Sequence, residues 1–271
     1  MTWPAPARVE DVRPMAGEAK VPAQAHVGDD QPFLLLANCD PPMFGDGVLE
    51  PMLRRMGLQP GAPSRANVAA QLFDGPFFEL NFAEQRALAG RVSGAAWQSI
   101  DHPATVGGAT EVLACVPTGI LEGSRVSACR ELFKLAVLLI DLTGADKIYW
   151  SPAALWSDAW TFRAAVAEMM ASGMPPVLHL VAFHPLGTAG ALRSQGLSFF
   201  AGQEIEVRSD GGLAARELLR RMARLAIDVM VNGAILSPRE FPGLVNSERV
   251  RVEPATGCDG TMTLFLSIEA R

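Results

Sequence analysis

The sequence has few of the residues and motifs that build metal, redox or nucleophile sites. It contains only four cysteines, at positions 39, 115, 129 and 258, and no two of them form a C-x-x-C pair. No G-x-S-x-G, G-x-G-x-x-G or G-x-x-x-x-G-K-[ST] segment occurs. The chain therefore has no recognisable zinc or dithiol pair, no serine-hydrolase elbow and no common phosphate-binding loop. We expect no cofactor and no metal.

Long apolar runs and an excess of positive charge are also missing. No stretch approaches the ~18 apolar residues of a membrane span, and residues 1–20 lack the basic start and apolar centre of a signal peptide. The net charge is −6, with a single tyrosine and 7% aromatic residues. Nucleic-acid binders usually need a basic stripe or a stacking platform. We therefore expect a cytoplasmic protein that binds neither membrane nor nucleic acid.

What is present is enough apolar sequence for a sizeable core, at 49% hydrophobic residues over 271 positions. Residues 1–30 are rich in Ala, Pro, Asp and Glu without periodicity, which predicts a flexible arm. Trp3, Val9, Val12 and Met15 leave open that this arm docks on the body or on a neighbouring subunit. Residues 31–271 are expected to form a single α+β body, with pseudo-halves of about 31–150 and 151–271.

Apolar spacing predicts the elements of this body. We expect helices at 48–56, 124–143, 157–172 and 213–231, where apolar residues recur at helical spacing and glycines follow at 57, 144, 173 and 233. The predicted strands are 33–37, 111–116, 147–150, 177–183 and 197–207, followed by a C-terminal hairpin over about 250–268. The stretch 77–100 fits either strands or a helical turn.

The order of these elements predicts an α+β fold with a mainly antiparallel sheet. The C-terminal hairpin alternates apolar with largely polar residues, which indicates helices on one face of the sheet only. Both pseudo-halves resemble a split βαβ order, so a plan of two fused ferredoxin-like halves is an open alternative.

Several short motifs resemble one bacterial family. They are GAAWQS (94–99), LACVP (113–117), TGADKIYW (143–150), a helix centred on Trp160-Thr161-Phe162, PPVLHLVAF (175–183) and QGLSFFAGQEIEV (195–207). Together they resemble the "domain of unknown function 4261" family over about residues 33–240. Phe200-Ala201-Gly202 departs from its tighter pattern. The resemblance implies no activity, cofactor or catalytic residue.

Four residues are candidates for ligand binding: Trp150, His184, Glu204 and Glu206. Trp150 ends a predicted strand, where an aromatic ring can form the floor of a pocket, but a core aromatic is the favoured interpretation. Glu204 and Glu206 share one strand face and suit acid/base or cation chemistry, although a solvated face paired with Arg208 is favoured. His179 and His184 are five residues apart on an expected strand, so they should point to opposite faces and not share a metal.

The sequence thus predicts a non-catalytic protein-interaction or binding module more strongly than an enzyme. The expected partner is another protein or a second copy of the chain, contacted through the 1–30 arm or the polar sheet face. The alternative is a small-molecule hydrolase with a cleft near Trp150, His184 and Glu204. No catalytic residue is assigned.

Overall fold

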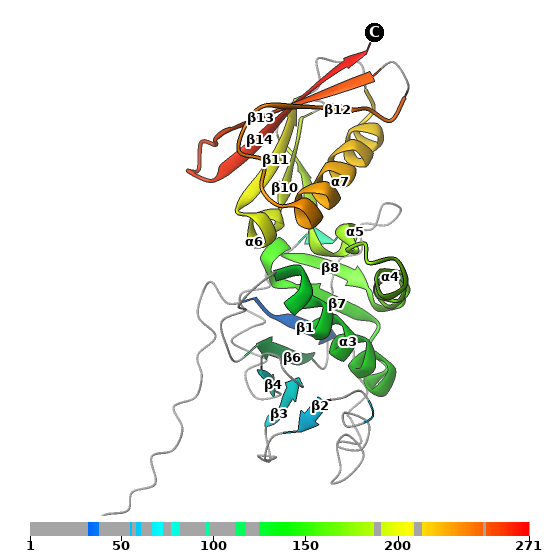
Figure 1. Cartoon of the computed structure of the whole chain (residues 1–271). Coiled ribbons are helices and arrows are strands. Elements are labelled where there is room, and N and C mark those ends of the chain that lie inside the picture. The colour runs from blue at the N-terminus through cyan, green and yellow to red at the C-terminus, as the bar shows by residue number, and fades with distance from the viewer. Residues whose placement is uncertain are drawn as a thin grey trace, which may run out of the picture.

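The computed structural model describes residues 32–37, 55, 58–60, 67–72, 77–81, 96–97, 112–117, 125–186, 191–208, 213–245 and 248–270. The predicted arm over 1–30 lies outside these ranges, as does the predicted helix over 48–56 except for one residue. Within the described part the chain is an α+β protein with two sheets, which lie end to end in Figure 1 with helices beside them. The expectation of one sheet is therefore wrong, while the α+β class and the mainly antiparallel pairing are confirmed.

The N-terminal sheet has eight strands in the order β2-β3-β4-β6-β1-β7-β8-β5. Every pairing is antiparallel except that of β5 with β8. Strand β4 shows that the ambiguous stretch after residue 77 begins as a strand. The strands are β1 (Leu34–Ala37), β2 (Leu58–Pro60), β3 (Asn67–Leu72), β4 (Phe77–Asn81), β5 (Ala96–Trp97), β6 (Val112–Pro117), β7 (Lys147–Trp150) and β8 (Leu155–Asp158).

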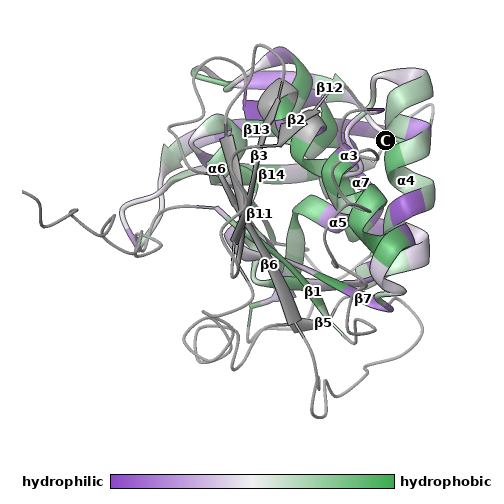
Figure 2. Cartoon of the chain, turned by 90° about the horizontal axis from the view of Figure 1, so that it is seen from below, coloured by the Kyte–Doolittle hydropathy of each residue, from purple (hydrophilic) through white to green (hydrophobic). Residues whose placement is uncertain are grey.

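The centre of this sheet is buried on both faces. Leu34 lies opposite Trp150, and both face the main core together with the helices. Leu35 and Tyr149 point to the other face and are also buried, at 2% and 3% exposure. Figure 2 shows β1 as a hydrophobic strand, as expected for a central strand without a solvated side.

Helices α3 (Arg125–Thr143) and α4 (Ala159–Ser172) end where the sequence predicted and begin within two residues of the predicted starts. Gly144 and Gly173 adopt positive φ angles of 64° and 79°, which favour glycine at a helix C-terminus. The Asp158 carboxylate accepts the Thr161 N–H at 2.8 Å and so caps α4. No helix in the described ranges is both long enough and apolar enough to cross a bilayer.

The C-terminal sheet has six strands in the order β12-β13-β14-β11-β10-β9, and only β11 and β14 are parallel. Helix α7 (Ala215–Asn232) packs on one face through Leu218, Met222 and Val229, as predicted. The predicted C-terminal hairpin is formed by β13 and β14. The strands are β9 (Ala182–Pro185), β10 (Ala191–Gln195), β11 (Gln203–Arg208), β12 (Arg239–Pro242), β13 (Glu248–Thr256) and β14 (Met262–Ala270).

Two predicted strands are correct only in their last residues. The stretch 177–183 forms the short helix α5 (Val177–Leu180) before β9, and 197–207 forms the short helix α6 (Leu197–Ala201) before β11. Gly196 and Gly202 flank α6 with φ of 95° and 69°, so the backbone turns sharply at both and cannot continue as a strand. At Gly196 a Cβ atom would also lie 2.7 Å from the Ala153 Cβ.

The two sheets share one hydrophobic cluster, which runs from Leu34 in β1 to Leu266 in β14. The 3₁₀ turn η1 (Ser151–Ala153), α5 and α6 join them. Ferredoxin-like halves are not confirmed. The C-terminal sheet has three strands before α7 and three after it, with β11 beside β14, which is not a βαββαβ order.

Candidate functional site

Trp150 is a core residue. It is 2% exposed, and its ring packs against Phe133, Phe199 and Phe200 at centroid distances of 5.7, 5.5 and 6.3 Å. Its indole Nε1 is buried and has no hydrogen-bond partner. The side chain therefore joins the helices to the N-terminal sheet.

Glu204 has a structural role that the sequence did not reveal. Its carboxylate accepts hydrogen bonds from the Ser194 hydroxyl, from the Gly196 N–H at 2.9 Å and from the Ser198 N–H at 3.0 Å. It thereby holds the start of α6 against β10. Since Glu204 is only 5% exposed, the interpretation of a solvated strand face is wrong.

Glu206 and His184 lie in one row across the C-terminal sheet, each directly opposite Arg193 of β10. Glu206 is 4% exposed, and Arg193 forms an ion pair with Asp259. His184 is half-buried, and its Nε2 atom makes no hydrogen bond. Trp150 lies in the N-terminal sheet and the other three predicted residues lie in the C-terminal sheet.

His179 and His184 belong to no cluster of potential metal ligands among the described residues. His179 sits on α5 and His184 on β9. Burial lowers the pKa of His179 to about 4, against a smaller opposing attraction from Asp158. His179 is half-buried, and its neutral imidazole packs in edge contact with Phe162.

The structure instead has a small hollow between α7 and the β12–β13 connection. Its volume is about 100 Å³. We call it the α7–β12 hollow, and it is lined by Arg221, Arg224, Leu225, Asp228, Phe241, Pro242, Gly243, Leu244 and Val250. Most of its wall is apolar, and the two arginines and one aspartate come from α7.

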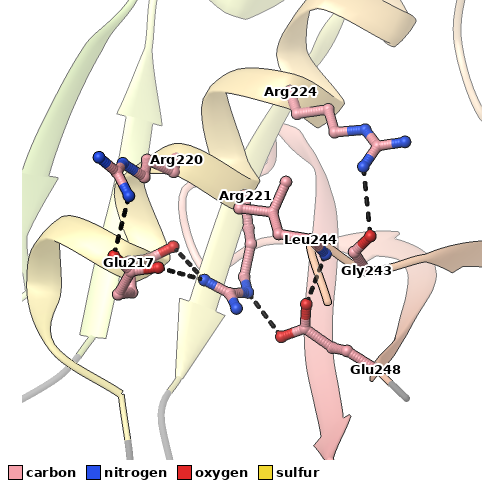
Figure 3. A network of polar contacts seen from close by, with 7 residues as sticks. All are labelled: Glu217, Arg220, Arg221, Arg224, Gly243, Leu244 and Glu248. Carbon is pink, nitrogen blue, oxygen red and sulfur yellow. Dashed lines mark hydrogen bonds and ion pairs between the residues drawn. The ribbon is translucent and has the colours of Figure 1, made fainter. Parts of the chain in front are cut away.

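A buried charge pair lies beneath this hollow (Figure 3). The Arg221 Nε–H donates to Glu248 Oε1 at 2.6 Å, and the two side chains are 6% and 3% exposed. Arg221 Nη1 also donates to the Glu217 carbonyl at 2.7 Å and to the Glu217 carboxylate at 3.2 Å. The guanidinium therefore joins α7 to β13, with carboxylates on both sides.

The pKa of each group is shifted in the direction that favours its charged form. Burial disfavours the charged form of Arg221, but its bonds to Glu248 and Glu217 outweigh burial and raise its pKa. Burial likewise opposes ionisation of Glu248, but Arg221 and the Leu244 N–H outweigh it and lower the pKa of this carboxyl. Both groups are thus charged at neutral pH, and the pair is intact.

Glu248 also fixes the loop above it, residues 243–245. Its second oxygen, Oε2, accepts the Leu244 N–H at 2.6 Å, while its backbone carbonyl accepts the Gly243 N–H at 2.9 Å. Arg224 donates to the Gly243 carbonyl at 3.2 Å. A Cβ at position 243 would lie 2.1 Å from Glu248 Oε2, so this close approach requires glycine.

The loop presents apolar side chains to solvent. Leu244 is 42% exposed and Val245 is 58% exposed. The arrangement therefore combines a fixed loop, two exposed apolar residues and an adjoining hollow of side-chain size.

Sequence reasoning missed Arg221 and Glu248. Arg221 is one turn from Leu218 and directly before Met222, which places it toward the buried side of α7. Glu248 precedes Val250 and Val252 with a spacing of two, which places it on the inner face of β13. The signal in each case was a charge at an inward-facing position.

No family model matches the chain, and no curated protein or solved structure is significantly similar to it.

Proposed function

We propose that this protein is a non-catalytic protein-binding module that contacts its partner at the α7–β12 hollow and the loop 243–245. The observation that carries the proposal is the exposure of Leu244 and Val245 on a loop held by a buried ion pair. Binding residues are commonly placed on loops positioned by a rigid scaffold. A loop already held in place loses less conformational entropy when a partner binds.

The size of the hollow supports a protein partner over a metabolite. Sites for small molecules usually occupy about 300–1,000 Å³, whereas this one holds about 100 Å³. That volume suits one anchoring side chain, with the exposed loop residues widening the contact around it. A bacterial cytoplasmic setting and membership of the domain of unknown function 4261 family remain part of this proposal.

The hydrolase alternative finds no support in the described residues. The Glu204 carboxylate is taken up by three donors at the start of α6, and Trp150 is enclosed by core aromatics. A general base must reach the proton that it removes in a plausible substrate pose. We therefore do not assign catalytic roles to these residues.

A displayed library of random peptides, selected against the full-length protein, tests the proposed function. Peptides that bind the wild type should bind Leu244→Ser at least about tenfold more weakly, because truncating an anchoring contact commonly costs more than 1 kcal/mol. Leu236→Ser is the matched control, since Leu236 is an even more exposed leucine, at 79%, outside the hollow. Failure to select any peptide, or equal binding to both variants, would refute the proposal.

A further inference from the structure

We infer that the partner segment is acidic, with one aliphatic side chain that enters the α7–β12 hollow and carboxylates on either side of it. This inference rests on the proposed function and adds the chemistry of the partner.

The helix beside the hollow is basic in an otherwise acidic protein. The chain has a net charge of −6. Helix α7, which forms one wall of the hollow, nevertheless carries four arginines, no lysine and two acidic residues. The arginines are Arg216, Arg220, Arg221 and Arg224, and the acids are Glu217 and Asp228. Arg249 and Arg251 lie on the outer face of β13, where they pair with Glu240 and Glu253.

Three of these arginines form a row on the outer side of α7. Arg216, Arg220 and Arg224 are spaced by four residues and are all exposed. Residues at this spacing share a helix face and lie about 6 Å apart along the axis. The row leads to the hollow, because Arg224 is part of its wall.

The charges along the row are only partly compensated. Arg220 pairs with Glu217 at 3.1 Å. In the described part of the chain, Arg216 and Arg224 form no ion pair, and Arg224 bonds only to the Gly243 carbonyl. Asp228 is the one acid in the wall, and it accepts a hydrogen bond from Asn232 at 2.7 Å. Carboxylates on a partner would therefore complement the guanidinium groups at the rim.

The interior of the hollow specifies the anchor. Leu225, Phe241, Pro242, Leu244 and Val250 supply apolar walls. An aliphatic side chain removes this surface from water without leaving a polar group unpaired, whereas a charged side chain inside would be desolvated. Leucine or isoleucine is the expected anchor.

The neighbouring sheet edge argues against binding by strand addition. Strand β12 pairs only with β13 among the described strands, but it is four residues long and contains Pro242, which has no N–H. Arg239 and Glu240 place charges on the same edge. Short, charged, proline-containing edges resist addition of a further strand. Recognition therefore depends on side chains.

The test uses the full-length protein and labelled synthetic peptides of about twelve residues, with the dissociation constant Kd measured by fluorescence anisotropy. The acidic probe carries Asp and Glu around one Leu, and two matched probes replace the acids with Lys or the Leu with Gly. We expect the acidic Leu probe to bind at least about tenfold more tightly than either matched probe. Its Kd should rise between about 50 and 500 mM NaCl, because salt screens exposed charges.

Two protein variants test whether the acidic probe binds beside the hollow. Arg224→Gln should weaken the acidic probe about three- to tenfold, as expected for loss of one rim charge. The control Arg130→Gln changes an exposed arginine on α3 and should leave its Kd unchanged. Equal binding of the Asp/Glu and Lys probes, or equal effects of the two variants, would overturn the inference.

The outcomes separate this inference from the proposed function. If selected peptides require Leu244 but acidic residues add nothing, the binding module stands and the acidic partner is refuted. If binding is insensitive to Leu244→Ser, both fail. If light scattering shows a dimer that becomes monomeric in Leu244→Ser, a second copy occupies the hollow and the inference of a separate partner is wrong.

Discussion

Replacement of Arg221 by methionine should strongly destabilise the fold. The substitution keeps a long side chain at position 221 of α7. It leaves the Glu248 carboxylate, which is 3% exposed, without its cation. Removing one partner of a buried pair typically costs about 3–5 kcal/mol, because an uncompensated charge stays out of water. We expect a loss of that size, reduced somewhat because the Leu244 N–H still bonds to Glu248.

The matched control is Arg220→Met. Arg220 pairs with the same Glu217 at 3.1 Å, but its side chain is 56% exposed. Exposed pairs contribute about 0–1 kcal/mol, so this variant should unfold almost as the wild type does. The measurement is urea unfolding followed by tryptophan fluorescence at neutral pH. A loss below about 1 kcal/mol for Arg221→Met would refute the assignment of a coupled buried pair.

A double-mutant cycle isolates the interaction between the two side chains. Glu248→Gln keeps an oxygen that can accept the Leu244 N–H but removes the negative charge. The double variant Arg221→Met/Glu248→Gln leaves neither charge of the pair. Its loss in free energy of unfolding should therefore be at least about 1 kcal/mol smaller than the summed losses of the two single variants. Additive losses would show that the two groups act independently.

The contribution of the pair also has a defined pH dependence. The folded protein holds the pKa of Glu248 below its ordinary value of 4.5, so the unfolded chain binds a proton first as the pH falls. The stabilisation is complete above pH ~4.5 and is lost as the pH falls through the lower, folded pKa. Arg221, whose pKa is raised, stays charged throughout. The stability difference between wild type and Arg221→Met should therefore shrink in acid.

Two further predictions concern buried polar groups outside the hollow. His179 has a folded pKa of about 4 against an ordinary value of 6.5, so the unfolded chain is protonated first as the pH falls from 6.5 to 4. Between pH 7.5 and 5 the free energy of unfolding of the wild type should fall by about 2 kcal/mol through this residue. Urea unfolding of His179→Phe should show a pH-dependent loss that is smaller by this amount. An equal loss of stability in both proteins would contradict the assignment to His179. Glu204→Gln should lower the stability measured by thermal unfolding by about 1–3 kcal/mol, because one of the three donors to Glu204 is left unpaired. The exposed control Glu253→Gln should lower it by under about 0.5 kcal/mol. Similar losses for the two variants would show that capping of α6 is unimportant.

The elements that the sequence predicted well are those with an unambiguous period. Strand β1 is a continuous apolar run ended by a Pro-containing segment, and α7 has one apolar stripe. The Asp158 cap and the turn at Gly173 depend on neighbouring residues only, so local chemistry is enough to place them. Period and local capping therefore account for the correct part of the fold.

The errors arose where distant contacts decide the conformation. The run 197–207 is apolar enough for a strand, but Gly196 packs on Ala153 of the 3₁₀ turn η1 with a positive φ. That turn brings two backbone N–H groups to the Glu204 carboxylate, so the residue is buried instead of solvated. The division into two sheets likewise depends on which strands pair, and a sequence period does not specify strand partners.

Stability alone does not explain why Arg221 and Glu248 are charged. Apolar residues of similar volume often hold buried positions as well as an ion pair does, because they avoid the cost of desolvation. Such residues would pack α7 against β13, but they would offer no acceptor to the Leu244 N–H. The carboxylate of Glu248 makes both contacts at once: one oxygen binds the helix through Arg221, and the other holds the loop. The charge pair is therefore best understood as a device for positioning Leu244 and Val245, and this links an inward-facing charge in the sequence to the proposed binding surface.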